Sequence, residues 1–385
     1  MLDAVRNQFS LPHLFVAVVA AFLLLGVAVP SAAHASDGPL RRALERFVAR
    51  DGGPPGIVVV VTRGHSVDVR TAGVASFDTR RPIRIDDHMR LASVAKAFSG
   101  AATLSLVSAG RLDLDDTIGK WRPDLPRSWW PVTLRQLLNH TSGIPDFSLE
   151  PAFRDALLAS LEVAPPPRQL LAFVFDKKPS FDPGTRYRYS NSDNIIVGLI
   201  VEAATSRTYE HVLERRVYRP LGLARTSLPS GPYLPRPLLR GYEIADDPPV
   251  DVSELFAAGW TWASGGVVST PGDAARFVRG YVGGAIVDRK ARAAQFRFIP
   301  GASSEPPGPG ANAAGLGLFR YETRCGTVYG HTGNTPGYTQ FISATADGTR
   351  SAIVSINGQI TPDRDAAAFA ELRRIYELAV CAALR

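Results

Sequence analysis

Residues 93–110 read SVAKAFSGAATLSLVSAG and are almost wholly apolar or small. Such a run predicts a buried helix that begins near Ser93 and ends at Gly110. Three residues of helix bring the Ser93 and Lys96 side chains onto one face. Because little water would surround Lys96, its neutral amine is favoured and can take a proton from the Ser93 hydroxyl. The helix start also places the Ser93 N–H where an oxyanion could bind.

The S-x-x-K spacing alone is weak evidence, because a helix-capping serine followed by a lysine with an exposed amine gives the same letters. Support comes from the stretch 189–191, YSN, between a Pro-Gly turn and a predicted helix. A phenol such as Tyr189 can shuttle a proton when a cation lies nearby, and the Asn191 amide could hold a substrate carbonyl. Tyr189 could instead only anchor its loop.

The stretch His331-Thr332-Gly333 gives further support, since it follows a short predicted strand. The edge of that strand could hydrogen-bond an extended substrate, and Gly333 would let the substrate approach closely. His331 could also be an ordinary imidazole at the end of a surface strand. The three motifs in this order nevertheless favour one shared site.

The rest of the chain predicts strands near both ends and helices between them. Predicted strands cover 57–64, 66–76, 315–322, 327–331, 338–344 and 351–357. Predicted helices cover 38–50, 94–109, 133–143, 151–176, 192–219 and 363–384, and Pro-rich loops cover 229–250 and 301–314. This order implies one sheet assembled from distant segments and a helical insertion, as a single catalytic unit with two lobes.

The composition is that of a globular protein. The 385 residues are 45% hydrophobic and 21% charged, which excludes collagen-like, coiled-coil and wholly disordered chains. The net charge of +7 suits an anionic surface such as a cell wall. The chain has no run of five Lys or Arg and no zinc-type Cys/His spacing, so we expect no nucleic-acid partner and no metal.

The start of the chain predicts export. Residues 14–30 read LFVAVVAAFLLLGVAVP and are followed by Ala33-His34-Ala35. This layout is typical of a secretory signal peptide, here 1–35, cleaved after Ala35. The protein would then be extracellular, associated with the cell wall and without stable membrane insertion. The alternative is an uncleaved signal anchor, because the run approaches the length of a spanning helix.

The chain has two cysteines, Cys325 and Cys381. In an exported protein an even pair predicts one disulfide, which would contribute about 4 kcal/mol in the loop-entropy model. Two buried thiols are the alternative.

Together the three motifs resemble those of the penicillin-interacting serine acyltransferases, whose usual forms include S-x-x-K, S-D-N and K-T-G. The chain is similar to the branch of actinomycete D-alanyl-D-alanine carboxypeptidases and class C β-lactamases, where Tyr replaces the first Ser of the second motif. The resemblance covers about 40–385 and includes the segments 137–143 LLNHTSG, 181–191 FDPGTRYRYSN, 219–228 RPLGLARTSL, 265–273 GGVVSTPGD and 315–319 GLGLF. The two cysteines also match a disulfide of the carboxypeptidase group.

This resemblance implies an α/β (α+β) fold of the β-lactamase/transpeptidase type, with an antiparallel sheet flanked by helices and a mostly helical lobe. The catalytic domain would cover 36–385. Its sheet lobe would take about 36–85 and 260–385, and its helical lobe about 86–259. We expect a monomer without a cofactor.

The resemblance also assigns the chemistry. Ser93 would be the nucleophile and Lys96 its base. Tyr189 would pass the proton to the leaving amine and later assist water. Asn191 would position the acyl amide of the substrate.

On the strand, the resemblance has His331 supply a polar group and Thr332 contact the terminal carboxylate. Asn334, after Gly333, would share the oxyanion hole with the Ser93 N–H. Trp260 would line the cleft, or else be an ordinary core indole. His140 is expected to be a structural turn residue.

Two positions depart from the family pattern. The resembling carboxypeptidases hold the substrate carboxylate with an Arg on the GLGL strand and a hydroxyl residue after the third motif. Here Phe319 and Asn334 stand at these positions. Arg320 follows Phe319 and would point to the opposite face of a regular strand, unless a bulge intervenes.

We therefore expect a secreted, penicillin-reactive serine D-alanyl-D-alanine carboxypeptidase that acts on peptidoglycan stem peptides. A class C-like β-lactamase or an esterase on the same fold is the alternative, and the substrates would then be β-lactams or esters. A non-catalytic wall-binding module on the same scaffold is a third interpretation.

Overall fold

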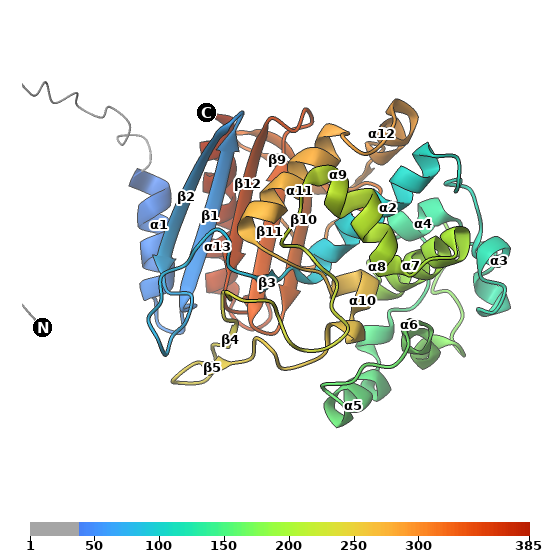
Figure 1. Ribbon diagram of the computed structural model, residues 1–385, viewed down its shortest axis with the longest axis horizontal. Coiled ribbons are helices and arrows are strands. Elements are labelled where there is room, and N and C mark those ends of the chain that lie inside the picture. Colours follow the sequence, from blue (N-terminus) through green and yellow to red (C-terminus); the bar gives the residue numbers. More distant parts are fainter. Residues whose placement is uncertain (1–37) are drawn as a thin grey trace, which may run out of the picture. The chain divides into compact units, whose positions relative to one another are not determined.

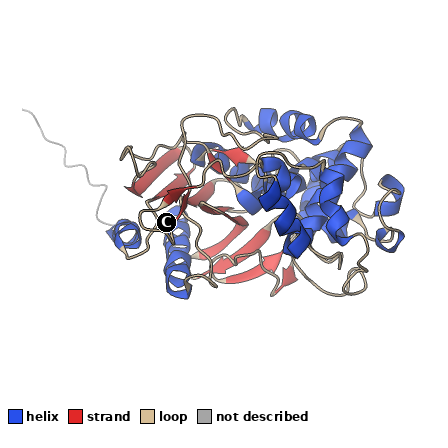
Figure 2. Ribbon diagram, turned by 90° about the horizontal axis from the view of Figure 1, so that it is seen from below, coloured by secondary structure: helices blue, strands red, loops and turns tan. Residues whose placement is uncertain are grey.

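The computed structural model describes residues 38–385, and the predicted signal peptide 1–35 lies outside them. The described part contains an eight-stranded antiparallel sheet in the order β2-β1-β12-β11-β10-β9-β8-β7. The predicted mixed α/β fold, with a large antiparallel sheet and helices, is confirmed. Figure 1 shows the blue strands β1 and β2 beside the red strand β12, and Figure 2 shows many of the helices gathered on one side of the strands.

The strands of this sheet have the following bounds: β1 Gly56–Arg63, β2 Ser66–Gly73, β7 Ile299–Pro300, β8 Ala311–Ala314, β9 Phe319–Thr323, β10 Gly326–Thr335, β11 Tyr338–Ala344 and β12 Arg350–Ile356. Two small sheets pair β3 Met89–Arg90 with β6 Val268–Ser269, and β4 Tyr242–Glu243 with β5 Val250–Asp251. The valine run of β1 is buried over almost its whole length because β1 is an inner strand, whereas side chains alternate in exposure along the edge strand β2.

The helices are α1 Gly38–Ala49, α2 Ala95–Ser108, α3 Ile118–Trp121, α4 Leu134–Leu138, α5 Pro151–Ala159, α6 Pro167–Leu170, α7 Asn191–Thr205, α8 Tyr209–Leu213, α9 Arg219–Leu221, α10 Trp262–Gly265, α11 Pro271–Gly283, α12 Arg289–Gln295 and α13 Ala366–Leu384. Helices α1 and α13 share one apolar core with one face of the sheet, and α2, α7 and α11 share the other. Among residues 38–385, no helix is both long and apolar enough to span a bilayer.

Two predicted helices are interrupted in the structure. The predicted helix 151–176 ends as α5 at Ala159, and Pro165 and Pro166 prevent a continuous helix into α6, which begins at Pro167. The predicted helix 192–219 ends as α7 at Thr205, because Ser206 adopts a left-handed conformation with φ 53°.

The predicted strand 315–322 is also partly wrong. Residues 315–318 form a turn between β8 and β9, and Gly317 has a φ of 65°. A Cβ at Gly317 would lie 2.7 Å from the Gly100 Cα of α2, so glycine lets this turn pack directly on the helix. The alternation of glycine with apolar residues in GLGLF is typical of a strand, so the sequence did not indicate this turn.

The predicted disulfide Cys325–Cys381 is present. It joins the turn between β9 and β10 to α13, so it ties the far end of the β9–β10 hairpin to the helix that covers the sheet.

Candidate active site

Ser93 lies in a 3₁₀ turn, Ala92–Val94, that leads directly into α2. Ala92 has a φ of 50°, a left-handed conformation that costs free energy for alanine and commonly occurs at functional sites. Strand β10 approaches this turn closely, since a Cβ on Gly333 would lie 2.3 Å from the Leu91 carbonyl oxygen. Gly333 therefore allows the strand edge to lie against the turn that carries Ser93.

Lys96 is buried one helical turn after Ser93, with 1% of its surface exposed. Its Nζ lies 3.1 Å from Ser93 Oγ, 2.7 Å from Asn191 Oδ1 and 2.7 Å from the Ser264 carbonyl oxygen. The last two oxygens can only accept. A neutral amine has two N–H groups for them and keeps its lone pair for the Ser93 hydroxyl, which is the arrangement a general base needs.

The environment of Lys96 favours this neutral amine. Burial lowers the pKa of Lys96 from 10.5 to about 7, although the carboxylates of Asp146, Glu305 and Asp193 oppose the shift. At neutral pH a substantial fraction of the protein therefore holds an unprotonated amine beside Ser93.

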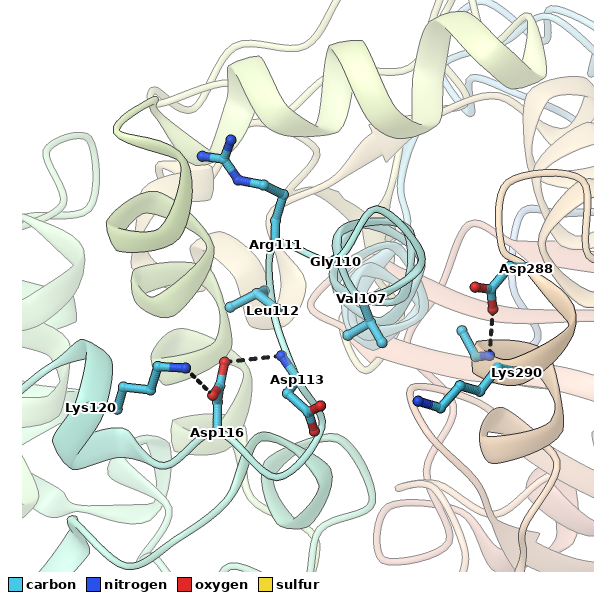
Figure 3. A pocket seen from close by; sticks show the side chains of 10 residues that line it. Val107, Gly110, Arg111, Leu112, Asp113, Asp116, Lys120, Asp288 and Lys290 are labelled. Carbon is cyan, nitrogen blue, oxygen red and sulfur yellow. Dashed lines mark hydrogen bonds and ion pairs between the residues drawn. The ribbon is translucent and has the colours of Figure 1, made fainter.

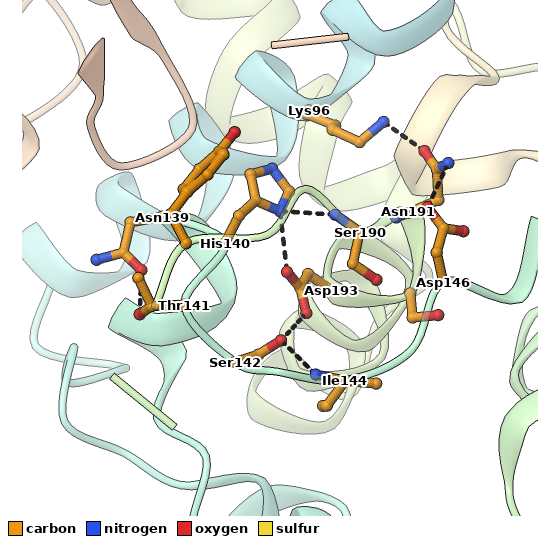
Figure 4. A network of polar contacts seen from close by, with 12 residues as sticks. Lys96, Asn139, His140, Thr141, Ser142, Ile144, Asp146, Ser190, Asn191 and Asp193 are labelled. Atoms are coloured by element: carbon orange, nitrogen blue, oxygen red, sulfur yellow. Dashed lines mark hydrogen bonds and ion pairs between the residues drawn. The ribbon is translucent and has the colours of Figure 1, made fainter. Parts of the chain in front are cut away.

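Asn191, the first residue of α7, holds Lys96 in place (Figure 4). Its Nδ2 donates to Asp146 Oδ2 at 3.0 Å and to Ser148 Oγ at 2.9 Å. The Asp146 carboxylate thereby turns the amide oxygen of Asn191 toward Lys96. Asp146, Ser148 and the Ser264 carbonyl were not foreseen from the sequence, because only the folded loops bring them to the site.

Tyr189 packs over Lys96, with the ring centroid 4.9 Å from Nζ. Burial raises the pKa of Tyr189 well above its usual value, and the nearby Ser93 hydroxyl offsets part of that rise. The Tyr189 hydroxyl has no partner with full hydrogen-bond geometry among the described residues. At neutral pH Tyr189 is thus a protonated phenol whose buried hydroxyl keeps its proton for donation.

The His140 ring packs against the Tyr189 ring. His140 follows α4 in a left-handed conformation with φ 57°, and its ring centroid lies 4.5 Å from that of Tyr189. Its Nδ1 lies 2.9 Å from Asp193 Oδ2, and Ser142 Oγ donates to the other oxygen at 2.5 Å (Figure 4). Burial and the charge of Lys96 lower the pKa of His140 to about 3, so its imidazole is neutral. His140 is a turn residue that positions the phenol.

The strand side of the site is formed by β9 and β10. His331 is buried, and its ring packs edge-on against Phe319 with centroids 5.0 Å apart. Its Nδ1 lies 2.5 Å from the Thr332 carbonyl oxygen, and the Tyr189 ring centroid is 6.5 Å away. Burial, with the charge of Lys96, lowers the pKa of His331 to about 3, so this residue is a neutral polar group.

The Thr332 hydroxyl is hydrogen-bonded to other residues of the protein. Thr332 Oγ1 lies 2.7 Å from both Ser304 Oγ and the Pro306 carbonyl oxygen, which belong to the loop between β7 and β8. Phe319 is 2% exposed. Arg320 lies on the other face of β9, where it pairs with Glu322 at 3.0 Å. The groups expected to hold a substrate carboxylate are thus replaced or engaged elsewhere.

A cavity of about 330 Å³ opens beside Ser93 and is lined by Asn191, Trp260 and Asn334 among others. The Asn334 side chain is fixed by donation from Nδ2 to the Ile360 carbonyl oxygen at 2.8 Å. A separate polar hollow of about 290 Å³ lies at the end of α2, around Asp116 and Lys120 (Figure 3). Ser93, Lys96 and Tyr189 are not among the described residues that line it. No cluster of possible metal ligands occurs within residues 38–385.

The fold and the serine–lysine–tyrosine arrangement define a serine hydrolase. Residues 40–376 match the family model described as Beta-lactamase, and the chain belongs to this family. Its members include β-lactamase-like and penicillin-binding-protein-like hydrolases that act on small peptides and β-lactams.

Three relatives illustrate the range of names within the family. The D-alanyl-D-alanine-carboxypeptidase/endopeptidase AmpH of Escherichia coli is 27% identical over 69% of each chain. A D-aminopeptidase of Brucella anthropi is 32% identical over 48% of this chain and 36% of its own length. A D-stereospecific amidohydrolase from Streptomyces superposes with a TM-score of 0.74 and 31% identity, covering 84% of this chain and 94% of its own. The chain spans only 36–39% of the first three curated relatives it matches.

Proposed function

We propose that this protein cleaves short D-amino acid amides and peptides through an acyl-enzyme on Ser93. The observation that carries the proposal is the buried Lys96 amine, 3.1 Å from Ser93 Oγ, with both acceptor oxygens placed to leave its lone pair for the serine. The names of the Streptomyces amidohydrolase and of the Brucella D-aminopeptidase support D-amino acid amides as the substrate class.

In the first half of the reaction, Lys96 takes the Ser93 proton while Ser93 Oγ bonds to the substrate carbonyl carbon. The backbone N–H groups of Ser93 and Asn334 receive the developing oxyanion. The carbon–nitrogen bond then breaks as Tyr189 gives its proton to the leaving amine. The proton held by Lys96 replaces the one that Tyr189 has lost.

In the second half, water attacks the acyl-enzyme. The water proton passes to the Lys96–Tyr189 pair as the new carbon–oxygen bond forms. The bond from the carbonyl carbon to Ser93 Oγ then breaks, and Ser93 regains its proton. The free acid leaves, and no metal or organic cofactor takes part in this sequence.

The strand side favours substrates that lack a free carboxylate next to the scissile bond. Phe319 replaces a cation there, and Thr332 is held by Ser304 and Pro306. A carboxylate on the leaving group would meet no basic side chain from these positions, and burial without a partner is costly. Amides and esters have no such cost.

D-Alanyl-D-alanine carboxypeptidase activity is the second candidate. The AmpH protein, which carries this activity in its name, matches across more than two thirds of the chain. The H-T-G motif on β10 also fits the pattern of the carboxypeptidase group. Acylation of Ser93 by penicillin and hydrolysis of simple esters would accompany either activity, because all begin with the same attack.

The test compares ammonia release from D-alanine amide with D-alanine release from a peptide that ends in D-Ala-D-Ala. We expect the amide to be cleaved with the higher kcat/KM. Ser93→Ala should abolish both activities and covalent labelling by penicillin, whereas Ser108→Ala, at the far end of α2, should retain them. Exclusive cleavage of the peptide would favour the second candidate. Absence of any Ser93-dependent reaction would refute both.

We also propose that the protein acts outside the cytoplasm after removal of residues 1–35. The Cys325–Cys381 disulfide supports this, since such bonds persist in oxidising compartments. Amino-terminal sequencing of protein collected from the culture medium tests it. A mature chain that begins at Ser36 is expected, and retention of the intact chain in the membrane fraction would contradict the proposal.

A further inference from the structure

The cavity beside Ser93 has a distinctly apolar wall. Among the described residues that line it, none is charged, and most are aromatic or aliphatic. Its aromatic side chains are those of Phe147, Phe153, Phe256 and Trp260, and leucines lie around them. At about 330 Å³ it lies near the lower end of ligand pockets, so it fits one compact group rather than a long peptide.

The position of the cavity decides which part of a substrate enters it. Ser93 and Asn191 line the cavity, whereas Tyr189, His331 and Thr332 do not. In the proposed reaction Tyr189 delivers a proton to the leaving group, which must therefore lie on the Tyr189 side of Ser93. The cavity lies on the other side of Ser93, where the acyl half of the substrate would lie.

The wall is preformed. Trp260 Nε1 donates to the Ser160 carbonyl oxygen at 2.9 Å, so the polar atom of the indole is satisfied and its ring can face an apolar group. Phe153 packs edge-on against Trp260 and Phe147, with centroids 5.7 and 5.0 Å apart. Such a fixed aromatic wall loses little conformational entropy when a ligand binds.

The outer rim of the cavity is also apolar. Leu158 on α5 is 64% exposed and Leu255 is 42% exposed, and both line the cavity. Large exposed apolar side chains that surround a cavity commonly mark a ligand site. A polar or acidic acyl group would meet no charged partner here.

We propose that this cavity is an acyl-side pocket that selects substrates with a bulky apolar side chain, aromatic or branched aliphatic, on the residue whose carbonyl Ser93 attacks. The inference rests on the proposed function and adds the chemical class of the acyl group. It implies that a D-phenylalanyl substrate is preferred over a D-alanyl substrate with the same leaving group.

The test uses the p-nitroanilides of D-phenylalanine and D-alanine, and the p-nitrophenyl esters of phenylacetate and acetate. Within each pair the leaving group is identical, so the ratio of kcat/KM reports the acyl pocket alone. For the wild-type protein we expect a ratio of at least about tenfold in favour of the aromatic substrate, from burial of the ring.

Leu158→Glu places a charge at the exposed rim, where folding does not depend on the leucine. It should lower this ratio about tenfold in each pair that is turned over. Leu149→Glu is the matched control, because Leu149 is 71% exposed and does not line the cavity. This variant should keep the wild-type ratio.

The outcomes separate the two proposals. Ser93-dependent release with a ratio near one, or with a ratio that Leu158→Glu leaves unchanged, would overturn the acyl pocket and leave the proposed function standing. Absence of Ser93-dependent release from all four substrates would overturn both.

Discussion

The site has a helical side, formed by Lys96, Tyr189 and Asn191, and a strand side, formed by β9 and β10. The polar side chains of the two sides differ in whether they face Ser93 or are bound within the protein. On the helical side, Lys96 and Asn191 hold one another and direct a lone pair at Ser93. On the strand side, Thr332 is bound to a loop of its own chain, and His331 is a neutral ring packed on Phe319. The helical side holds the proposed nucleophile, base and proton donor, whereas the strand side offers little charge to a substrate.

This difference separates the features of the family pattern that serve the reaction from those that serve substrate recognition. Ser93, Lys96 and Tyr189 would perform the acyl transfer of the proposed mechanism, and their side chains lie close together. Substrate recognition depends on the groups around them, and these differ from the carboxypeptidase pattern. The four predictions below test this division, beginning with the largest effect.

Lys96→Met removes the amine and keeps most of the side-chain volume. We expect kcat/KM for amide substrates to fall by about 10³-fold or more, because the Lys96 amine is the proposed base and its Nζ lies 3.1 Å from Ser93 Oγ. Steady-state kinetics measures this. Near-UV circular dichroism should show a native fold, so that the loss is one of chemistry. A decrease of less than tenfold would mean that Lys96 is not the base.

The pH profile of the wild-type protein tests the same residue without mutation. Only the neutral amine can accept a proton, and its pKa is lowered to about 7. The kcat/KM should therefore fall about tenfold for each pH unit below 7 and level off above it. His140 and His331, with pKa values of about 3, do not titrate in this range. A flat profile down to pH 5 would contradict the assignment.

Tyr189→Phe separates proton delivery from nucleophilic attack. Amide cleavage should fall about 10²-fold, because an amine leaves poorly without a proton. Release of p-nitrophenolate should fall much less in the acylation step, since this group leaves as an anion. Stopped-flow measurement of the ester burst gives that step directly. Equal losses for both substrates would place Tyr189 in a general structural role.

Thr332→Val tests the strand side and should have the smallest effect. Loss of the contacts to Ser304 and Pro306 should lower the free energy of unfolding by about 1–2 kcal/mol. Because this hydroxyl binds the loop between β7 and β8 rather than the substrate, kcat/KM for amides should change less than threefold. Denaturant unfolding and kinetics measure the two quantities. A selective loss for substrates with a free carboxylate would instead show that Thr332 contacts them.

The motifs of the helical side could be predicted from the sequence because each is local, although the contact between Lys96 and Asn191 joins distant segments. Ser93 and Lys96 are one helical turn apart, and Tyr189 and Asn191 flank the start of α7. The strand side could not be predicted in this way. A Pro-rich composition over 301–314 predicts a loop but not its contact with Thr332. Likewise, the letters GLGLF do not show that Gly317 turns the chain onto α2.

The pairing of β1 with β12 has a consequence for biosynthesis. Ile57 aligns with Ile356, so β1 gains this neighbour only after β12 has been synthesised. Contacts of such large sequence separation slow folding. Assembly of the β1–β12 pair must therefore follow synthesis of β12, and chaperones that delay collapse should raise the yield of native protein.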